Sequence, residues 1–301
     1  MSRQRWAGLA GLTAALALYT AGADRLWESG LWPDLLFLTL VLFPATFALV
    51  WLLLPLRASR AMLPAGLALV ALAVLTHVTD LDVLNNLAKL FALVCIGFWF
   101  LSWFENVMWA ALIAVIIPWV DAISVWRGPT EYVVEQQPQV FDTVSIAFRV
   151  PGEDSTANLG PPDILFFALL LAAAERFHLR VAWTWIAMTA LLSVTLALVW
   201  AWDDAPGLPA LPAVCLGFLA PNADLLWRDA RSAWSTRARP TDLAPIAPIP
   251  PRAPPPRPIN PSSRARPGRK AKLQLVTWRT LGRHRLSDRP CSGRSGASYT
   301  L

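Results

Sequence analysis

The length and spacing of the apolar runs constrain this chain more than any other feature. An α-helix needs about 20 mostly apolar residues to cross the hydrocarbon core of a bilayer. Eight segments of roughly that length, separated by short polar stretches, cover residues 6–23, 33–56, 61–78, 84–104, 107–126, 157–177, 181–202 and 208–227. The sequence therefore predicts an all-α, polytopic membrane protein with about eight transmembrane helices.

The composition agrees with this prediction and excludes several classes of protein. Hydrophobic residues make up 55% of the chain and charged residues only 15%, whereas soluble proteins carry about 25% charged residues. This balance excludes a water-soluble enzyme and a disulfide-rich secreted module. The three cysteines and three histidines are scattered along the chain and show no ligand spacing, so we expect neither a metal site nor a cofactor.

The charge is concentrated in the last part of the chain. Residues 228–301 contain 16 Lys/Arg and 3 Asp/Glu, and the segment Pro240–Pro267 has 11 prolines in 28 residues. A segment with this composition cannot pack a core. We therefore predict that residues 228–301 form a Pro/Arg-rich, largely disordered cytoplasmic tail that is attracted to anionic lipid. No nucleic-acid-binding motif is present, and we expect no nucleic-acid partner.

The basic residues of the short loops predict the orientation in the membrane. Lys and Arg are enriched in cytoplasmic loops, and an even number of spans places Arg3, Arg5, Arg57, Arg60, Arg176, Arg180 and the tail on one side. We therefore expect both termini in the cytoplasm and the long loop 128–158 outside. The excess of Arg (23) over Lys (3) indicates a GC-rich coding sequence and favours a bacterial plasma membrane.

Two acidic residues fall inside predicted spans. The apolar run before Asp121 has 14 residues and the run after Asp163 has 11, so each span reaches full length only by including its carboxylate. A carboxylate in the bilayer costs at least about 2.5 kcal/mol and usually faces a cavity or another polar group. One loop joins the two spans, which puts the acids at matched depth. We expect Asp121 and Asp163 to form a facing pair that shares one proton.

Spacing alone leaves the role of such a pair open. Shared carboxylates activate water in aspartic proteases. Intramembrane acids also serve as proton relays in transporters or as structural hydrogen-bond partners.

Three stretches carry a resemblance that favours the first of these roles. Asp121 is followed by Gly128-Pro129 and an acidic segment, Asp163 ends the sequence Leu159-Gly160-Pro161-Pro162-Asp163, and Pro209-Ala210-Leu211-Pro212 follows in the last span. In this order they resemble the motifs of the presenilin and signal peptide peptidase family of intramembrane aspartyl proteases. The similarity covers about residues 84–227, whereas the N-terminal transmembrane region 1–83 shares only its hydrophobic pattern.

The resemblance implies a fold, a site and an activity. It implies a presenilin-like helical fold in which Asp121 and Asp163 are catalytic and no cofactor is used. Gly160 and the tetrapeptide Pro209, Ala210, Leu211 and Pro212 would shape the substrate cleft. The expected reaction is hydrolysis of peptide bonds within transmembrane segments or signal-peptide remnants.

Two departures from the family pattern keep a second hypothesis open. Val120 stands where the family usually has Tyr, and Pro162 stands where it has Gly. The alternative is therefore a non-catalytic membrane protein, either a pseudoprotease that binds single helices or a transporter with a carboxylate proton relay.

The loop between the two acids carries a weaker pattern. Residues 140–150 alternate partly between apolar and polar positions and are rich in β-branched side chains, which is typical of a strand or hairpin. A plain surface loop is the alternative. If the segment is a strand, its exposed edge can hold an unwound substrate by strand addition.

Overall fold

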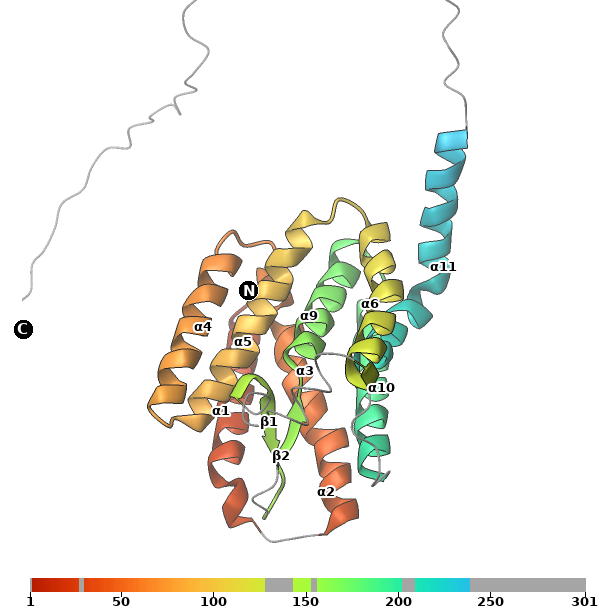
Figure 1. Cartoon of the computed structure of the whole chain (residues 1–301). Coiled ribbons are helices and arrows are strands. Elements are labelled where there is room, and N and C mark those ends of the chain that lie inside the picture. The colour runs from red at the N-terminus through yellow and green to blue at the C-terminus, as the bar shows by residue number, and fades with distance from the viewer. Residues whose placement is uncertain (1, 27–29, 128–142, 153–155, 202–208, 239–301) are drawn as a thin grey trace, which may run out of the picture. The chain divides into compact units, whose positions relative to one another are not determined.

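The computed structural model describes residues 2–26, 30–127, 143–152, 156–201 and 209–238 (Figure 1). The chain divides into two units, Met1–Leu243 and Ala244–Leu301. All described residues belong to the first unit, which contains both predicted transmembrane regions, 1–83 and 84–227. The predicted tail begins at residue 228, but residues 228–238 continue the last helix, so the tail boundary is corrected to a later position. The prediction of disorder from residue 239 onward concerns residues outside the described ranges, which also exclude residues 128–142 of the predicted external loop.

The described residues are mostly helical, and each predicted span overlaps a helix or a continuous helical run. In chain order these elements are α1 (Arg3–Gly22) with η1 (Ala23–Arg25), α2 (Leu31–Phe37), the π-helical turn η2 (Leu38–Leu42), α3 (Phe43–Leu53) with η3 (Leu54–Leu56), α4 (Met62–Val78), α5 (Asp82–Phe100) with η4 (Leu101–Trp103), α6 (Val107–Arg127), α9 (Pro161–Arg176), α10 (Val181–Ala201) and α11 (Leu211–Ala238).

Five of these helical runs are long and apolar enough to cross a membrane: Arg3–Arg25, Trp32–Leu56, Asp82–Trp103, Val107–Val125 and Val181–Val199. Helix α4 is apolar but shorter, and it exposes large apolar side chains such as Leu67, Val74 and Leu75. Apolar helices of this length and exposure are those of a membrane protein. The count of eight spans stays a prediction.

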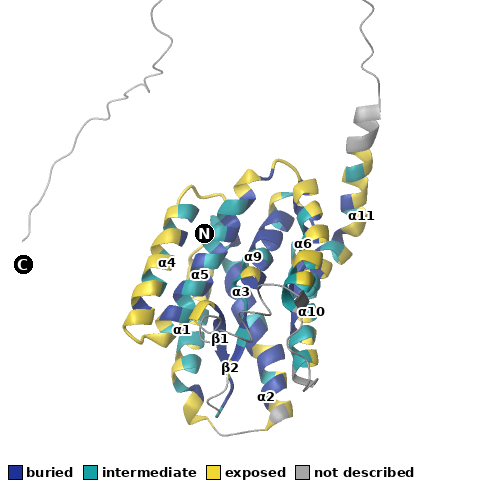
Figure 2. Ribbon diagram, viewed as in Figure 1, coloured by how far each residue is buried: buried dark blue, intermediate teal, exposed yellow. Residues whose placement is uncertain are grey.

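Helix α9 lies at the centre of the helical bundle. Ile164 and every residue from Phe167 to Ala174 are buried (Figure 2), and α9 packs against α5, α6, α10 and α11. Its 16 residues measure about 24 Å at 1.5 Å per residue, which is less than the roughly 30 Å of a hydrocarbon core. A helix enclosed by other helices does not need to match the bilayer, and this explains why its apolar run is short.

Close backbone contact holds α9 against its neighbours. A side chain at Gly97 of α5 would meet the Leu165 carbonyl oxygen at 2.8 Å, so only glycine allows α5 to approach α9 at this point. On another side, the ring of Phe47 from α3 stacks on Phe167 with the ring centroids 4.0 Å apart. Residues far apart in the sequence therefore fix the position of the helix that carries Asp163.

A short sheet precedes α9 and corrects the predicted start of that span. The sequence predicts helix from residue 157, but strand β2 (Thr156–Leu159) pairs there with β1 (Ile146–Arg149) in an antiparallel hairpin, with Ile146 opposite Leu159. The residue before a proline is disfavoured in the α region, and prolines are well suited to the first turn of a helix. Gly160-Pro161-Pro162 therefore ends the strand and starts the helix.

Charged residues tie together the opposite end of the bundle. Arg57 forms an ion pair of 2.9 Å with Glu175, and Arg180 forms one of 2.8 Å with Asp224. The Arg176 guanidinium donates a hydrogen bond of 2.6 Å to the Leu101 carbonyl. Three of the arginines that the sequence assigns to one side thus lie where α9 ends, away from the hairpin where it begins.

The contact between α10 and α11 allows a test of this packing. A Cβ at Gly217 would lie 2.5 Å from the Met188 Cα, whereas a Cβ at Gly11 of α1 would meet nothing within 4 Å. We expect Gly217→Ala to lower the melting temperature in detergent, because overpacking typically costs about 1–3 kcal/mol. Gly11→Ala is the control and should leave it unchanged or raise it slightly, since alanine favours helix. Equal effects of the two changes would contradict the packing of α10 on α11.

Candidate active site

Asp121 lies on the inward side of α6. The buried residues of this helix follow a helical repeat through Val107, Ala110 and Ala114, and Asp121 continues that stripe with a half-buried side chain. Trp119, Val120 and Ile123 around it are exposed. The helical period of 3.6 residues therefore turns the carboxylate toward the bundle while its neighbours form an apolar outer surface.

Asp163 lies in the first turn of α9. Gly160 is the N-cap, Pro161 and Pro162 follow it, and Asp163 is the third helical residue, with 9% of its surface exposed. The first backbone N–H groups of a helix have no partner within the helix, so the two prolines remove donors that the helix does not use. The Asp163 carboxylate accepts a hydrogen bond from the Gly160 backbone N–H.

Gly160 leaves little room for a side chain, because the carboxylate of Asp163 lies close to its backbone. A Cβ at this position would lie 3.1 Å from Oδ2 of Asp163, which is closer than a side chain normally approaches. The Gly160 backbone is in an extended conformation (φ −66°, ψ 147°) that any residue adopts. A side chain at Gly160 would therefore have to displace the carboxylate by a few tenths of an ångström, so the constraint at this position is one of space and not of conformation.

The start of α11 brings the third motif to Asp121. The backbone N–H of Leu211, the first residue of α11, donates a hydrogen bond of 3.1 Å to Oδ2 of Asp121. Pro209 and Ala210 lead into this turn half-buried, and Pro212 is the second helical residue. A carboxylate is favoured at the N-terminus of a helix, where unpaired N–H groups and the helix dipole stabilise negative charge.

The two carboxylates form one electrostatic cluster. The charge of Asp121 acts on Asp163, and both charges act on Cys215. Cys215 is buried and lies one helical turn after Leu211, on the same face of α11. Sequence analysis missed this residue, although its spacing of four from Leu211 was a signal that it faces the acids.

The surroundings of the pair determine its chemistry. Within the described ranges, the ion pairs are Arg57–Glu175, Arg149–Asp82 and Arg180–Asp224, so neither Asp121 nor Asp163 is balanced there by a cation. Two nearby carboxylates without a cation are most stable when they hold one proton between them. Such a pair can donate one proton and accept another. In the same part of the chain no three His, Cys, Asp or Glu side chains are grouped so that they could hold a metal ion.

Comparisons with known proteins add no relative: no protein-family model matches the chain, and no curated protein matches it.

The repulsion between the carboxylates predicts the effect of neutralising one of them. Asp163→Asn keeps an oxygen that can accept from the Gly160 N–H but removes one charge of the pair. We expect its melting temperature to equal or exceed that of the wild type, with a difference that grows as the pH rises and the wild-type carboxylates ionise. Thermal unfolding in detergent between about pH 5 and 9 measures this difference. A lower melting temperature of the variant at high pH would show that the charge of Asp163 is balanced.

Proposed function

We propose that this protein is an intramembrane aspartyl endopeptidase that hydrolyses peptide bonds within transmembrane segments or signal-peptide remnants. One observation carries the proposal. Asp121 on α6, Asp163 on α9 and the Leu211 N–H at the start of α11 gather at one place, although they are far apart in the sequence. The same three motifs carry the resemblance to the presenilin and signal peptide peptidase family.

The pair performs both proton transfers that amide hydrolysis requires. The ionised carboxylate takes a proton from water, and the resulting hydroxide forms a bond to the scissile carbonyl carbon. The protonated carboxylate gives its proton to the amide nitrogen as the carbon–nitrogen bond breaks. The pair again holds one proton at the end of the cycle, and the Leu211 N–H keeps Asp121 in place throughout.

The surface around Asp121 suits an apolar substrate. Trp119, Val120 and Ile123 are exposed beside this half-buried carboxylate, so a transmembrane helix can approach the pair along α6. A helical substrate must be unwound before its amide is attacked, because helical carbonyls are already hydrogen-bonded. The hairpin is the extended structure adjacent to Asp163, and β2 runs directly into Gly160.

The proposal includes the membrane arrangement that the sequence predicts. It comprises eight spans in a bacterial plasma membrane, both termini in the cytoplasm, an external catalytic end and a tail that contacts anionic lipid. The grouping of Arg57, Arg176 and Arg180 at the end of the bundle away from the hairpin supports this arrangement.

Replacement of each acid tests the mechanism. Asp121→Asn and Asp163→Asn should each abolish cleavage of a single-span reporter in proteoliposomes, because an amide can neither activate water nor share the proton. The double variant should be no worse than either single variant, since the two groups act as one unit. The rate of the wild type should have a bell-shaped dependence on pH, with one ionised and one protonated carboxyl required.

Three results would count against this function. Substantial activity in either single variant would exclude the aspartyl mechanism. If the wild type binds the reporter helix without cleaving it, the protein is a pseudoprotease, and if it carries protons across the liposome membrane, it is a transporter with a carboxylate relay.

The Leu211 N–H allows a second test that leaves both acids in place. Leu211→Pro removes the donor to Asp121 at the first position of a helix, where proline is favoured, and α9 already begins with two prolines. We expect its cleavage rate to fall about 10- to 100-fold, which corresponds to the roughly 1.5–3 kcal/mol of a hydrogen bond to a charged group. Leu211→Ala is the control, because it loses the same buried side chain but keeps the N–H. Equal rates in the two variants would remove this hydrogen bond from the mechanism.

A further inference from the structure

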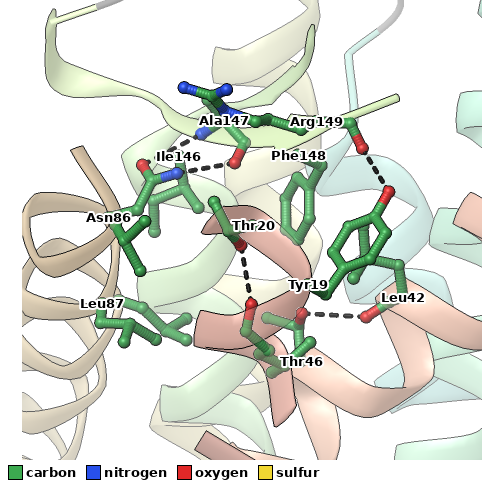
Figure 3. Close-up of a pocket in the computed structure, with 13 residues that line it drawn as sticks. Tyr19, Thr20, Leu42, Thr46, Asn86, Leu87, Ile146, Ala147, Phe148 and Arg149 are labelled. Carbon is green, nitrogen blue, oxygen red and sulfur yellow. Dashed lines mark hydrogen bonds between the residues drawn. The ribbon is translucent and has the colours of Figure 1, made fainter. Parts of the chain in front are cut away.

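Side chains from two helices occupy the outer edge of β1 (Figure 3). The carbonyl oxygens of Ser145, Ala147 and Arg149 alternate along the strand and therefore point to one side. Each accepts a hydrogen bond: from Nζ of Lys89 at 3.1 Å, from Nδ2 of Asn86 at 2.7 Å and from the Tyr19 hydroxyl at 2.7 Å, respectively. Residues 140–142 of the predicted strand lie outside the described ranges, but for the strand Ile146–Arg149 this finding corrects the expectation of an exposed edge.

Asn86 takes the place of a neighbouring strand at Ala147. Its amide donates to the Ala147 carbonyl and accepts from the Ala147 N–H at 3.3 Å. These are the two bonds that a third strand would make to the same residue. Ala147 directs both its N–H and its C=O group away from β2. The hydrogen bonds between the two strands therefore belong to its neighbours Ile146 and Phe148, which lie opposite Leu159 and Ala157.

Further contacts fix the hairpin to the helical bundle. The Gly152 N–H donates to the Ala23 carbonyl at the end of α1 at 2.8 Å, and the Phe148 ring lies 4.9 Å from that of Phe43. A small cavity lies between β1, α1 and α5, and Tyr19 and Asn86 form part of its wall (Figure 3). The hydrogen bonds from Asn86, Lys89 and Tyr19 therefore hold the strand across an incompletely packed region.

We propose that Asn86, supported by Lys89 and Tyr19, is a positioning residue that keeps the hairpin assembled before substrate arrives and closes β1 to strand addition. An unwound segment then meets a preformed β2, the strand that continues into Gly160 and Asp163. This consequence rests on the proposed peptidase function, whereas the assembly of the hairpin does not.

Hydrogen exchange of the intact protein without substrate tests the assembly. Asn86→Leu removes both hydrogen bonds with a side chain of similar size. We expect the amide hydrogens of residues 145–149 to exchange at least about tenfold faster in this variant, because one lost hydrogen bond of about 1.4 kcal/mol changes an opening equilibrium tenfold.

The neighbouring residue provides a matched control. Asn85 lies on the same helix and is buried, but its Oδ1 has no hydrogen-bond partner among the described residues. Asn85→Leu should leave exchange over 145–149 unchanged. If Asn86→Leu does not fold, Tyr19→Phe removes a single hydroxyl and should accelerate exchange near Arg149. Unchanged exchange in the folded Asn86 or Tyr19 variant, or an equal increase in the Asn85 variant, overturns the proposal.

Cleavage kinetics separate positioning from general damage. A loosened hairpin should raise the KM of Asn86→Leu several-fold and leave its pH profile unchanged, since the acids are intact. General unfolding would instead lower kcat through the loss of active protein, with KM unchanged, and that result would contradict the positioning role. If the wild-type protein has no peptidase activity, the proposed function is wrong. That result does not affect the proposed assembly of the hairpin, because hydrogen exchange measures the assembly without cleavage.

Discussion

The pairing of buried backbone groups is the constraint on which the rest of this structure depends. A backbone N–H or C=O group that is buried away from water is costly when unpaired, so buried backbone that is not helical must find partners within the protein. The hairpin meets this requirement on both edges of β1: β2 pairs with one edge, and Asn86, Lys89 and Tyr19 bond to the other. These three polar residues therefore occur in otherwise apolar helices because their side chains form hydrogen bonds to the strand.

The same constraint links the candidate catalytic groups to helix starts. Helices α9 and α11 begin inside the bundle, where their first N–H groups need partners. At α11 the Leu211 N–H is paired with Asp121, and at α9 the Gly160 N–H is paired with Asp163. The prolines in the first turns of these two helices have no N–H group, so fewer backbone donors remain that need a partner. The acids therefore complete the helix ends structurally, and the proposed function adds to this role the sharing of one proton.

Much of the arrangement was predictable from sequence, because it depends on the length of the apolar runs and on short sequence motifs. The helical segments, the inward position of Asp121 and a strand near residue 146 follow from periodicity and composition. The partner strand β2 could not be predicted in this way, because Thr156–Leu159 is short and adjoins an apolar run that is typical of a helix. The central position of α9 was also hidden, because a buried helix and a lipid-facing helix are equally apolar. Asn86 depends on contacts between distant segments, which one sequence does not display.

In the sequence, Pro162 stands where the family that this chain resembles has Gly, and its position in the helix explains why a proline is tolerated there. A proline beside the acid would be disruptive within a helix, but Pro162 is the second residue of α9, where no N–H is required. The glycine that lies close to the carboxylate is Gly160, where a Cβ would crowd Oδ2 of Asp163. The donor that Pro162 lacks is supplied two residues earlier by the Gly160 N–H. What the proline changes is the freedom of the backbone before Asp163, so this chain holds that carboxylate in place with a rigid turn and a clamped hairpin.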